Sequence, residues 1–215
     1  MIVDERYTTY LNSLYPELPA ELEEIRKEAI SNYVPIIRPE TINLLETLIS
    51  VSKPKRILEV GAAVGFSACL MAEAAGADCT ITTIENYPPR IPIANANFKR
   101  MGKEGQITLL EGDATDILKD LTGEYDFIFM DAAKGQYINF WPEIKRLIKD
   151  GGMVVTDNVL QDGDIIESRF AITRRNRTIH KRMRDYLFEL THDKCFTTTI
   201  LPLGDGVSIS VKGTK

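Results

Sequence analysis

The most constraining stretch of the sequence is Arg56–Ser67, RILEVGAAVGFS, in which an apolar run is followed by a turn of small residues. The run Arg56–Val60 is typical of a buried parallel strand, and Phe66 begins a segment with helical character. Gly61 and Gly65 let the backbone turn sharply and approach a ligand at the N-terminus of the helix. The stretch therefore predicts a strand–turn–helix unit that binds a ligand through backbone N–H groups.

A second predicted strand, CTITTIE, ends at Glu85. An acidic residue at this place in a nucleotide-binding α/β unit binds the hydroxyl groups of a ribose. The spacing around the turn, E-x-G-x-x-x-G, differs from the G-x-G-x-x-G of nicotinamide dinucleotide enzymes. Strand, turn, helix and acidic residue together indicate a nucleoside cofactor. The alternative is a tight strand–helix turn without a ligand.

Apolar runs alternate with helical patterns along the rest of the chain, which predicts an α/β fold with a doubly wound sheet. Strands are expected at 56–60, 79–85, 106–110, 125–130, 153–156, 196–201 and 207–211. The last two are joined by a short turn and must be antiparallel. We therefore expect a seven-stranded, mostly parallel sheet with an antiparallel hairpin at its edge, preceded by three extra N-terminal helices.

Length and composition fit one ordinary globular domain. The chain has 215 residues, of which 44% are apolar and 27% charged. We expect a single domain with a helical cap at 1–52 and a sheet-containing core at 53–215. An acidic, polar N-terminus, three scattered cysteines and the lack of a long apolar run indicate a cytoplasmic protein that does not contact a membrane.

Polar side chains follow the predicted strands at their carboxyl ends, where open α/β sheets bind ligands. Asp131 ends the fourth strand, and Asp157 and Asn158 end the fifth. Two carboxylates and an amide oxygen are ligands that suit Mg²⁺. Lys134 lies close to them in sequence, and a lysine beside a metal can serve as a general base. The alternatives are helix-capping acids and a solvated loop lysine.

LEVGAAVGFSA, the strand-ending Glu85, DAAKGQY and TDNVL together resemble the Mg²⁺- and S-adenosyl-L-methionine-dependent O-methyltransferases of the catechol and caffeoyl-CoA type. The resemblance covers the chain from about Tyr33 onward and implies a Rossmann-like class I methyltransferase fold. VPI at 34–36, DAAKGQY at 131–137, an arginine-rich segment and PLGDGVSIS at 202–210 resemble one bacterial branch. That branch methylates 5-hydroxyuridine at the tRNA wobble position to 5-methoxyuridine.

The resemblance implies roles for individual residues. The expected contacts to S-adenosylmethionine are Ile37, Glu59, Gly61, Phe66, Ser67, Glu85, Asp113, Ala114 and Asp131. The expected metal ligands are Asp131, Asp157 and Asn158, and the expected catalytic residues are Asp131 and Lys134, with Lys134 as the base. Three prolines within 87–92 depart from the family pattern just after Glu85. By analogy with related enzymes we also expect a homodimer.

A basic segment at 168–184, SRFAITRRNRTIHKRMR, stands out in an otherwise acidic protein. It holds seven of the 26 Arg and Lys residues and none of the 31 acids, so the rest of the chain carries 19 − 31 = −12. Such a segment can contact several phosphates. We expect the tRNA contacts to be Arg174, Arg175, Arg177 and Lys181; the alternative is a solvated helix face.

Four functions remain open at this point. The leading hypothesis is methylation of the 5-hydroxyl of a tRNA uridine. The second keeps the chemistry and replaces tRNA with a small catechol-type or caffeoyl-CoA-like substrate. A nicotinamide-dependent dehydrogenase explains Glu85 but not the acids at 131 and 157, and a non-catalytic RNA-binding protein explains only the basic segment.

Overall fold

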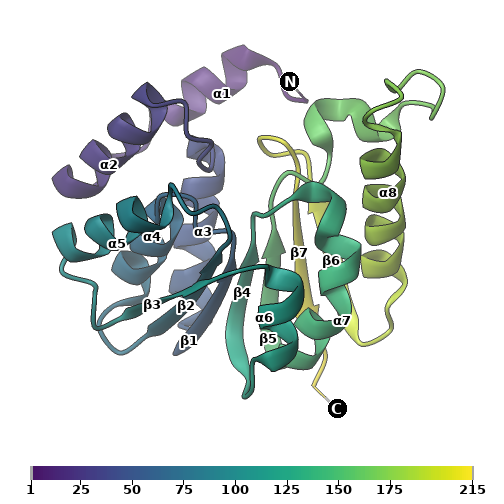
Figure 1. Cartoon of the computed structure of the whole chain (residues 1–215). Helices are drawn as coiled ribbons and strands as arrows, with labels where there is room; N and C mark the ends of the chain where they lie inside the picture. The colour runs from purple at the N-terminus through teal and green to yellow at the C-terminus, as the bar shows by residue number, and fades with distance from the viewer. Residues whose placement is uncertain (1, 215) are drawn as a thin grey trace.

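A seven-stranded sheet with helices on both faces forms the centre of the protein, whose computed structural model describes residues 2–214 (Figure 1). The strand order is β3-β2-β1-β4-β5-β7-β6. The strands are β1 Arg56–Val60, β2 Thr80–Glu85, β3 Ile107–Glu111, β4 Tyr125–Met130, β5 Ile148–Thr156, β6 Phe196–Leu201 and β7 Val207–Lys212. The first five are parallel, and β7 pairs antiparallel with both β5 and β6. The predicted fold class, including the antiparallel edge hairpin, is confirmed.

Two groups of helices cover the two faces of the sheet. The first group is α2 Ala20–Ser31, α3 Pro39–Ser52, α4 Phe66–Ala75 and α5 Ile91–Arg100, with α1 Glu5–Asn12 lying against α3. The second group is α6 Ala114–Asp120, α7 Tyr137–Leu147 and α8 Arg177–His192, with the short 3₁₀ helices η1 Lys134–Gln136 and η2 Gln161–Ile166. The predicted three N-terminal helices are all present.

Each face of the sheet has its own apolar core because successive strand residues point to opposite faces. In β1, Ile57 belongs to the core beneath α2–α5, and Leu58 to the core beneath α6–α8. In β4, Phe127 likewise belongs to the core beneath α2–α5, and Ile128 to the core beneath α6–α8. A strand buried on both faces must be apolar at nearly every position, which is why these strands are readable as continuous apolar runs.

The N-terminal helices share a core with the sheet. Leu22 of α2 and Leu45 of α3 are fully buried in the same cluster as Phe66 of α4. Burying a side chain of this size is worth about 1.5–3 kcal/mol. These contacts attach the helices to the sheet, and the division into 1–52 and 53–215 stays a prediction.

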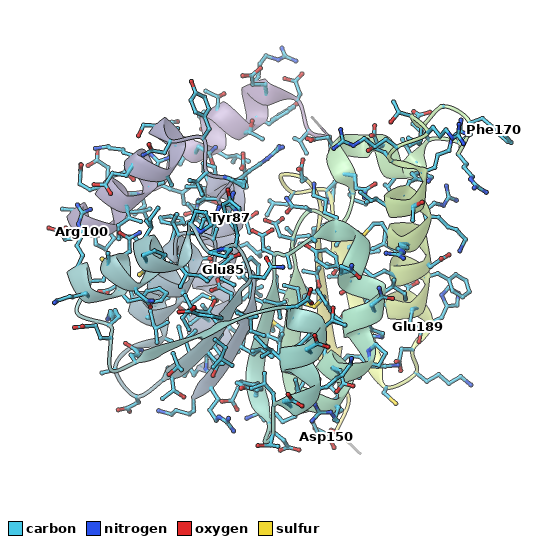
Figure 2. The ribbon with its side chains drawn as sticks, in the orientation of Figure 1. Glu85, Tyr87, Arg100, Asp150, Phe170 and Glu189 are labelled. Carbon is cyan, nitrogen blue, oxygen red and sulfur yellow. The ribbon has the colours of Figure 1, made fainter. Side chains whose placement is uncertain are left out.

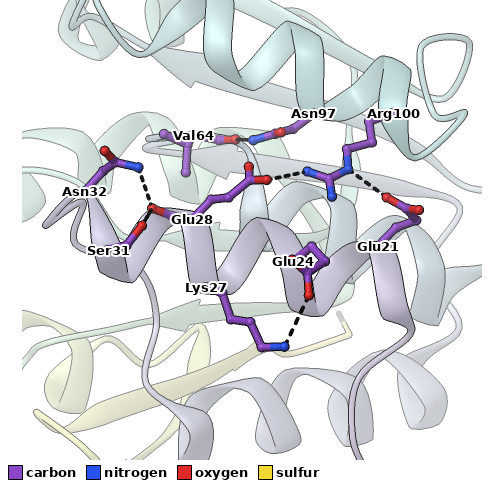
Figure 3. A network of polar contacts seen from close by, with 9 residues as sticks. All are labelled: Glu21, Glu24, Lys27, Glu28, Ser31, Asn32, Val64, Asn97 and Arg100. Atoms are coloured by element: carbon purple, nitrogen blue, oxygen red, sulfur yellow. Dashed lines mark hydrogen bonds and ion pairs between the residues drawn. The ribbon is translucent and has the colours of Figure 1, made fainter.

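Polar contacts attach α2 to α5 and α5 to the glycine turn (Figure 3). The Arg100 guanidinium lies 2.7 Å from Glu21 and 2.9 Å from Glu28, so one side chain of α5 reaches two turns of α2. The Asn97 amide donates a hydrogen bond to the Val64 carbonyl at 2.8 Å. Helix α5 therefore connects the N-terminal helices to the predicted ligand-binding turn.

The starts of β5 and α8 differ most from the sequence-based expectation, whereas the other strand boundaries lie within one residue of it. The strand β5 begins at Ile148 and not at Met153, because a bulge lets it pair first with Tyr125 and then with Phe127. The helix α8 begins at Arg177 and not at Thr173. Its buried face contains His180 and Met183, whereas Ile179, expected to point inward, is 38% exposed.

Among residues 2–214, no helix combines the length and the apolar character needed to cross a membrane. The cytoplasmic location stays a prediction.

Candidate functional site: a cofactor cavity beside an acidic cluster

A cavity of about 630 Å³ opens at the carboxyl ends of the parallel strands. Its walls come from the segment before α3, the glycine turn, and the ends of β2, β3 and β4. The predicted site residues that line it are Ile37, Gly61, Phe66, Ser67, Glu85, Asp113, Ala114, Asp131, Lys134 and Asn158. Residues from six separate parts of the chain thus meet at one cavity large enough for a nucleoside-sized ligand.

The glycine turn lies against the end of β4 with no space for a side chain at its first position. Gly61 has φ of 105°, and a Cβ there would lie 2.2 Å from the carbonyl oxygen of Asp131. Gly65, with φ of 79°, is the N-cap of α4. Glycine is the residue that adopts such angles without strain. The turn therefore brings bare backbone to the cavity wall beside Asp131.

Glu85 stabilises this turn in addition to lining the cavity. One carboxylate oxygen accepts a hydrogen bond from the Ala63 N–H at 2.7 Å. The other accepts from the N–H groups of Asn86 and Tyr87 at 2.9 and 2.8 Å. Figure 2 shows Glu85 and Tyr87 together near the centre of the molecule. The structural role of Glu85 was not predicted, because Ala63 is distant in sequence and carries no distinctive side chain.

Glu59, expected to contact the cofactor, lies outside the cavity lining. Its side chain is fully buried, and one oxygen accepts a hydrogen bond from the Thr83 hydroxyl at 2.5 Å. Burial raises the pKa of Glu59 to about 7, and the hydrogen bonds from Ser67 and Thr83 only partly oppose this. In the structure Glu59 thus connects β1 to β2 beneath the turn, and its contact with the cofactor stays a prediction.

Replacing Glu59 should flatten the pH dependence of stability. The folded state holds its proton up to about pH 7, whereas an unfolded glutamate loses it near pH 4.5, so stability falls as pH rises through this window. Above it the penalty is about 3 kcal/mol. We expect Glu59→Gln to narrow the difference in unfolding free energy between pH 4.5 and 8, measured by urea titration. An unchanged difference would contradict this.

Asp131 and Asp157 lie next to each other at the ends of β4 and β5. They follow Met130 and Thr156, which pair in register, and the Asp157 N–H donates to the Met130 carbonyl at 3.0 Å. The Asp157 carboxylate accepts from the Asn158 N–H at 2.7 Å. Burial raises the pKa of both carboxyls; the charge of Glu59 adds to this at Asp131, and the charge of Asp131 adds to it at Asp157. A positive ion beside them would stabilise their charged forms.

The donor set at this cluster fits a hard divalent cation. The two carboxylates are joined by the amide of Asn158, which lines the cavity with φ of 60°. Over residues 2–214, no group of three or more His, Cys, Asp or Glu side chains is arranged to hold a metal. The predicted ligand set contains only two side chains of these types, Asp131 and Asp157, because its third member is the amide of Asn158.

Lys134 lines the cavity at the start of η1, and its ammonium lies 3.6 Å from a carboxylate oxygen of Asp205. The other Asp205 oxygen lies 2.7 Å from Arg38. Neither Asp205 nor Arg38 was predicted as a site residue. The sequence signal that could have indicated Asp205 is the predicted hairpin. Because β7 runs antiparallel to β5, the turn before β7 lies at the edge of the sheet where β5 ends.

The basic segment, residues 168–184, borders the cavity through η1. The Arg182 guanidinium donates to the Gly135 carbonyl at 3.1 Å, between the cavity residues Lys134 and Gln136. Arg174 and Arg175 are exposed. Figure 2 shows Phe170, in the same segment, at the outer edge of the molecule. These cations therefore extend outward from one wall of the site.

Two of the four predicted tRNA contacts have partners within the chain. Arg177 donates to the Ile172 carbonyl at 3.1 Å, and Lys181 lies 2.5 Å from Asp185 one helical turn away. Contacts of this kind restrain both side chains, which makes Arg174 and Arg175 the better candidates for a partner's phosphates.

The sheet order, the glycine turn and the acidic cavity define a Rossmann-like enzyme with a nucleoside cofactor, and comparison with known proteins identifies its family. The O-methyltransferase family matches residues 12–213. Caffeoyl-CoA O-methyltransferase 1 of Arabidopsis thaliana is 30% identical over 223 residues, covering 96% of this chain and 83% of the relative.

Two solved structures of methyltransferases are similar to this chain along nearly its whole length. A proposed caffeoyl-CoA O-methyltransferase from Staphylococcus aureus is 34% identical, with a TM-score of 0.90 and coverage of 97% of this chain and 100% of the other. SAH-bound methyltransferase PaMTH1 of Podospora anserina is 26% identical, with a TM-score of 0.88 and coverage of 98% and 95%.

The chain therefore belongs to the O-methyltransferase family. The predicted enzyme class, an S-adenosylmethionine-dependent O-methyltransferase, is confirmed. The dehydrogenase and non-catalytic alternatives are set aside on this ground.

Proposed function

We propose that the protein transfers a methyl group from S-adenosylmethionine to the 5-hydroxyl of 5-hydroxyuridine in tRNA. The observation that carries the tRNA assignment is the contact between the basic segment and the cavity wall, Arg182 to Gly135. A neutral catechol needs no exposed cations at that place, whereas a polyanion gains from them.

The cavity offers the donor a matching set of groups. The backbone at Gly61 and the N-terminus of α4 face the carboxylate-bearing end of the cofactor, and Glu85 accepts from its ribose hydroxyls. Asp113 and Ala114 flank the adenine, and Ile37 contributes apolar surface.

We propose that Asp131, Asp157 and Asn158 hold Mg²⁺. When bound, the ion lowers the pKa of the hydroxyl to be methylated. Burial and neighbouring negative charges support this assignment, because they disfavour the charged forms of both carboxyls and a dication would stabilise those forms.

Lys134, in its neutral form, would take the hydroxyl proton, and the ammonium so formed would stabilise the oxyanion. The acceptor oxygen then bonds to the methyl carbon as the carbon–sulfur bond breaks. The electron pair of the broken bond stays on sulfur. The enzyme's contribution is to hold oxygen, carbon and sulfur in line. A homodimer and the tRNA partner both belong to this proposal.

A second candidate is a small catechol-type or caffeoyl-CoA-like acceptor. The Arabidopsis relative, named for caffeoyl-CoA, favours it. Both acceptors present a ring hydroxyl beside a second oxygen, so the same cavity chemistry serves either. The basic segment favours tRNA over a neutral catechol, and the assay with caffeoyl-CoA, whose CoA part also carries phosphates, separates the two polyanions.

The acceptor is decided by an activity assay with a charge variant. Wild type is offered tRNA from a strain lacking the protein, catechol and caffeoyl-CoA, and the products are identified by mass spectrometry. We expect 5-methoxyuridine from tRNA. Arg174→Ala/Arg175→Ala should weaken tRNA binding and lower its log–log salt slope by roughly 2, if each makes one phosphate contact.

The matched control is Lys55→Ala/Lys119→Ala, which removes two exposed ion-paired cations outside the basic segment. The control should keep the wild-type salt slope. Equal slopes in all three proteins, together with methylation of a catechol alone, would contradict the tRNA assignment and establish the second candidate.

A further inference from the structure

Three segments far apart in the sequence meet at Asp205, in the turn between β6 and β7. Arg38, the residue before α3, lies 2.7 Å from one Asp205 carboxylate oxygen. The same Arg38 nitrogen donates to Asp162 of η2 at 3.0 Å. Asp205 is only 7% exposed, whereas the Arg38 side chain is 37% exposed, so the carboxylate end of this ion pair is the shielded one. Arg38 thus occupies one side of the Asp205 carboxylate.

The other side of that carboxylate faces the reactive part of the cavity. Its second oxygen lies 3.6 Å from the Lys134 ammonium. Lys134 lines the cavity together with Asp131 and Asn158. Asp205 therefore lies between a cation with a structural role, Arg38, and the one placed to act on the acceptor.

The backbone around Asp205 leaves little freedom to move. The Asp205 carbonyl accepts from the Leu160 N–H at 2.9 Å, and the Gly206 carbonyl accepts from the Val159 N–H at 2.9 Å. A Cβ on Gly206 would lie 2.7 Å from the Leu160 nitrogen. The hairpin turn is thus bonded directly to the segment that follows Asp157 and Asn158.

We propose that Asp205 is a positioning residue for methyl transfer, whose anchored carboxylate holds the Lys134 ammonium over the cavity beside Asp131. The inference rests on the role proposed above for Lys134. A lysine side chain has a flexible four-carbon stem and loses much rotamer freedom when it is fixed. Because the Asp205 carboxylate is anchored, the Lys134 side chain loses this freedom when the protein folds and not when the substrate binds. The reactive geometry is therefore already formed in the free enzyme.

The first test is the kinetics of Asp205→Asn, which keeps the side-chain size and removes the charge. We expect kcat to fall at least tenfold, while KM for the acceptor and Kd for S-adenosylmethionine stay within about threefold. The matched control is Asp150→Asn. Asp150 lies 3.7 Å from Lys212 and, as Figure 2 shows, at the edge of the molecule away from Glu85 and Tyr87. It should keep wild-type kinetics.

The second test asks whether Asp205 acts through Lys134. In a Lys134→Met background, Asp205→Asn should cause no further loss of kcat, because coupled residues are non-additive. Equal losses in both backgrounds, or full activity of Lys134→Met alone, would overturn the proposal. Asp205→Glu restores the charge and should recover part of the lost kcat; a rate as low as that of Asp205→Asn in a folded protein would also overturn it.

The cycle is run on whichever acceptor the wild type methylates. Failure of the tRNA assignment would appear as wild-type activity on a catechol alone, and the coupling between Asp205 and Lys134 would still be measured on that substrate. The two failures are therefore distinguishable.

Discussion

Asp157→Ala is expected to abolish methyl transfer while leaving the affinity for S-adenosylmethionine within a few-fold of wild type. The variant removes Asp157, the buried one of the two adjacent carboxylates at the acidic cluster, whereas the glycine turn and Glu85 remain in place. Loss of a metal's electrostatic contribution is worth several kcal/mol, which is a rate decrease on the order of 1,000-fold. Turnover with added Mg²⁺ and calorimetric cofactor binding measure the two quantities.

The control for this variant is Asp116→Ala, which removes an exposed carboxylate from α6. It should keep wild-type turnover, and EDTA should inactivate both it and the wild type. An Asp157→Ala protein that retains full activity in EDTA would show that methyl transfer needs no metal at this place.

Gly61→Ala is expected to eliminate cofactor binding and to destabilise the fold. The added Cβ would meet the Asp131 carbonyl oxygen at 2.2 Å, and both groups belong to the backbone, so the turn itself must shift. The φ of 105° adds strain of about 1–3 kcal/mol. Calorimetry with S-adenosylmethionine and with NADH, and thermal unfolding, test these expectations.

Gly76→Ala is the matched control, because Gly76 also has a positive φ, of 78°, but a Cβ there meets nothing within 4 Å. It should lose stability and keep S-adenosylmethionine binding. Gly61→Ala binding the cofactor as tightly as Gly76→Ala would mean that the turn is not the cofactor's backbone contact. Tight NADH binding by wild type with no S-adenosylmethionine binding would contradict the cofactor assignment.

The order of helices and strands, the sheet type and ten of the residues that line the cavity could be predicted from the sequence. The strands β1 and β4 are apolar on both faces because helices cover both, and that pattern is local in the chain. The parallel strands end at one edge, so residues that follow them, such as Asp131 and Asn158, must gather there.

One boundary that was predicted wrongly, the start of β5, depends on pairing with another strand, β4. The strand β5 starts early because a bulge accommodates its extra residues against β4. His180 takes the place of Ile179 on the buried face of α8, whose other expected members, Met183, Tyr186 and Leu190, are buried.

The tertiary structure alone decided which polar side chains face the ligand and which support the fold. Glu59 and Glu85 both end or nearly end a strand, yet Glu59 is fully buried against Thr83, whereas Glu85 lines the cavity and accepts from the Ala63 N–H. Asp205 meets Arg38 and Lys134 only through strand pairing. Such contacts join side chains that lie far apart in the sequence, as Arg38 and Asp205 do. Local sequence patterns therefore do not predict them.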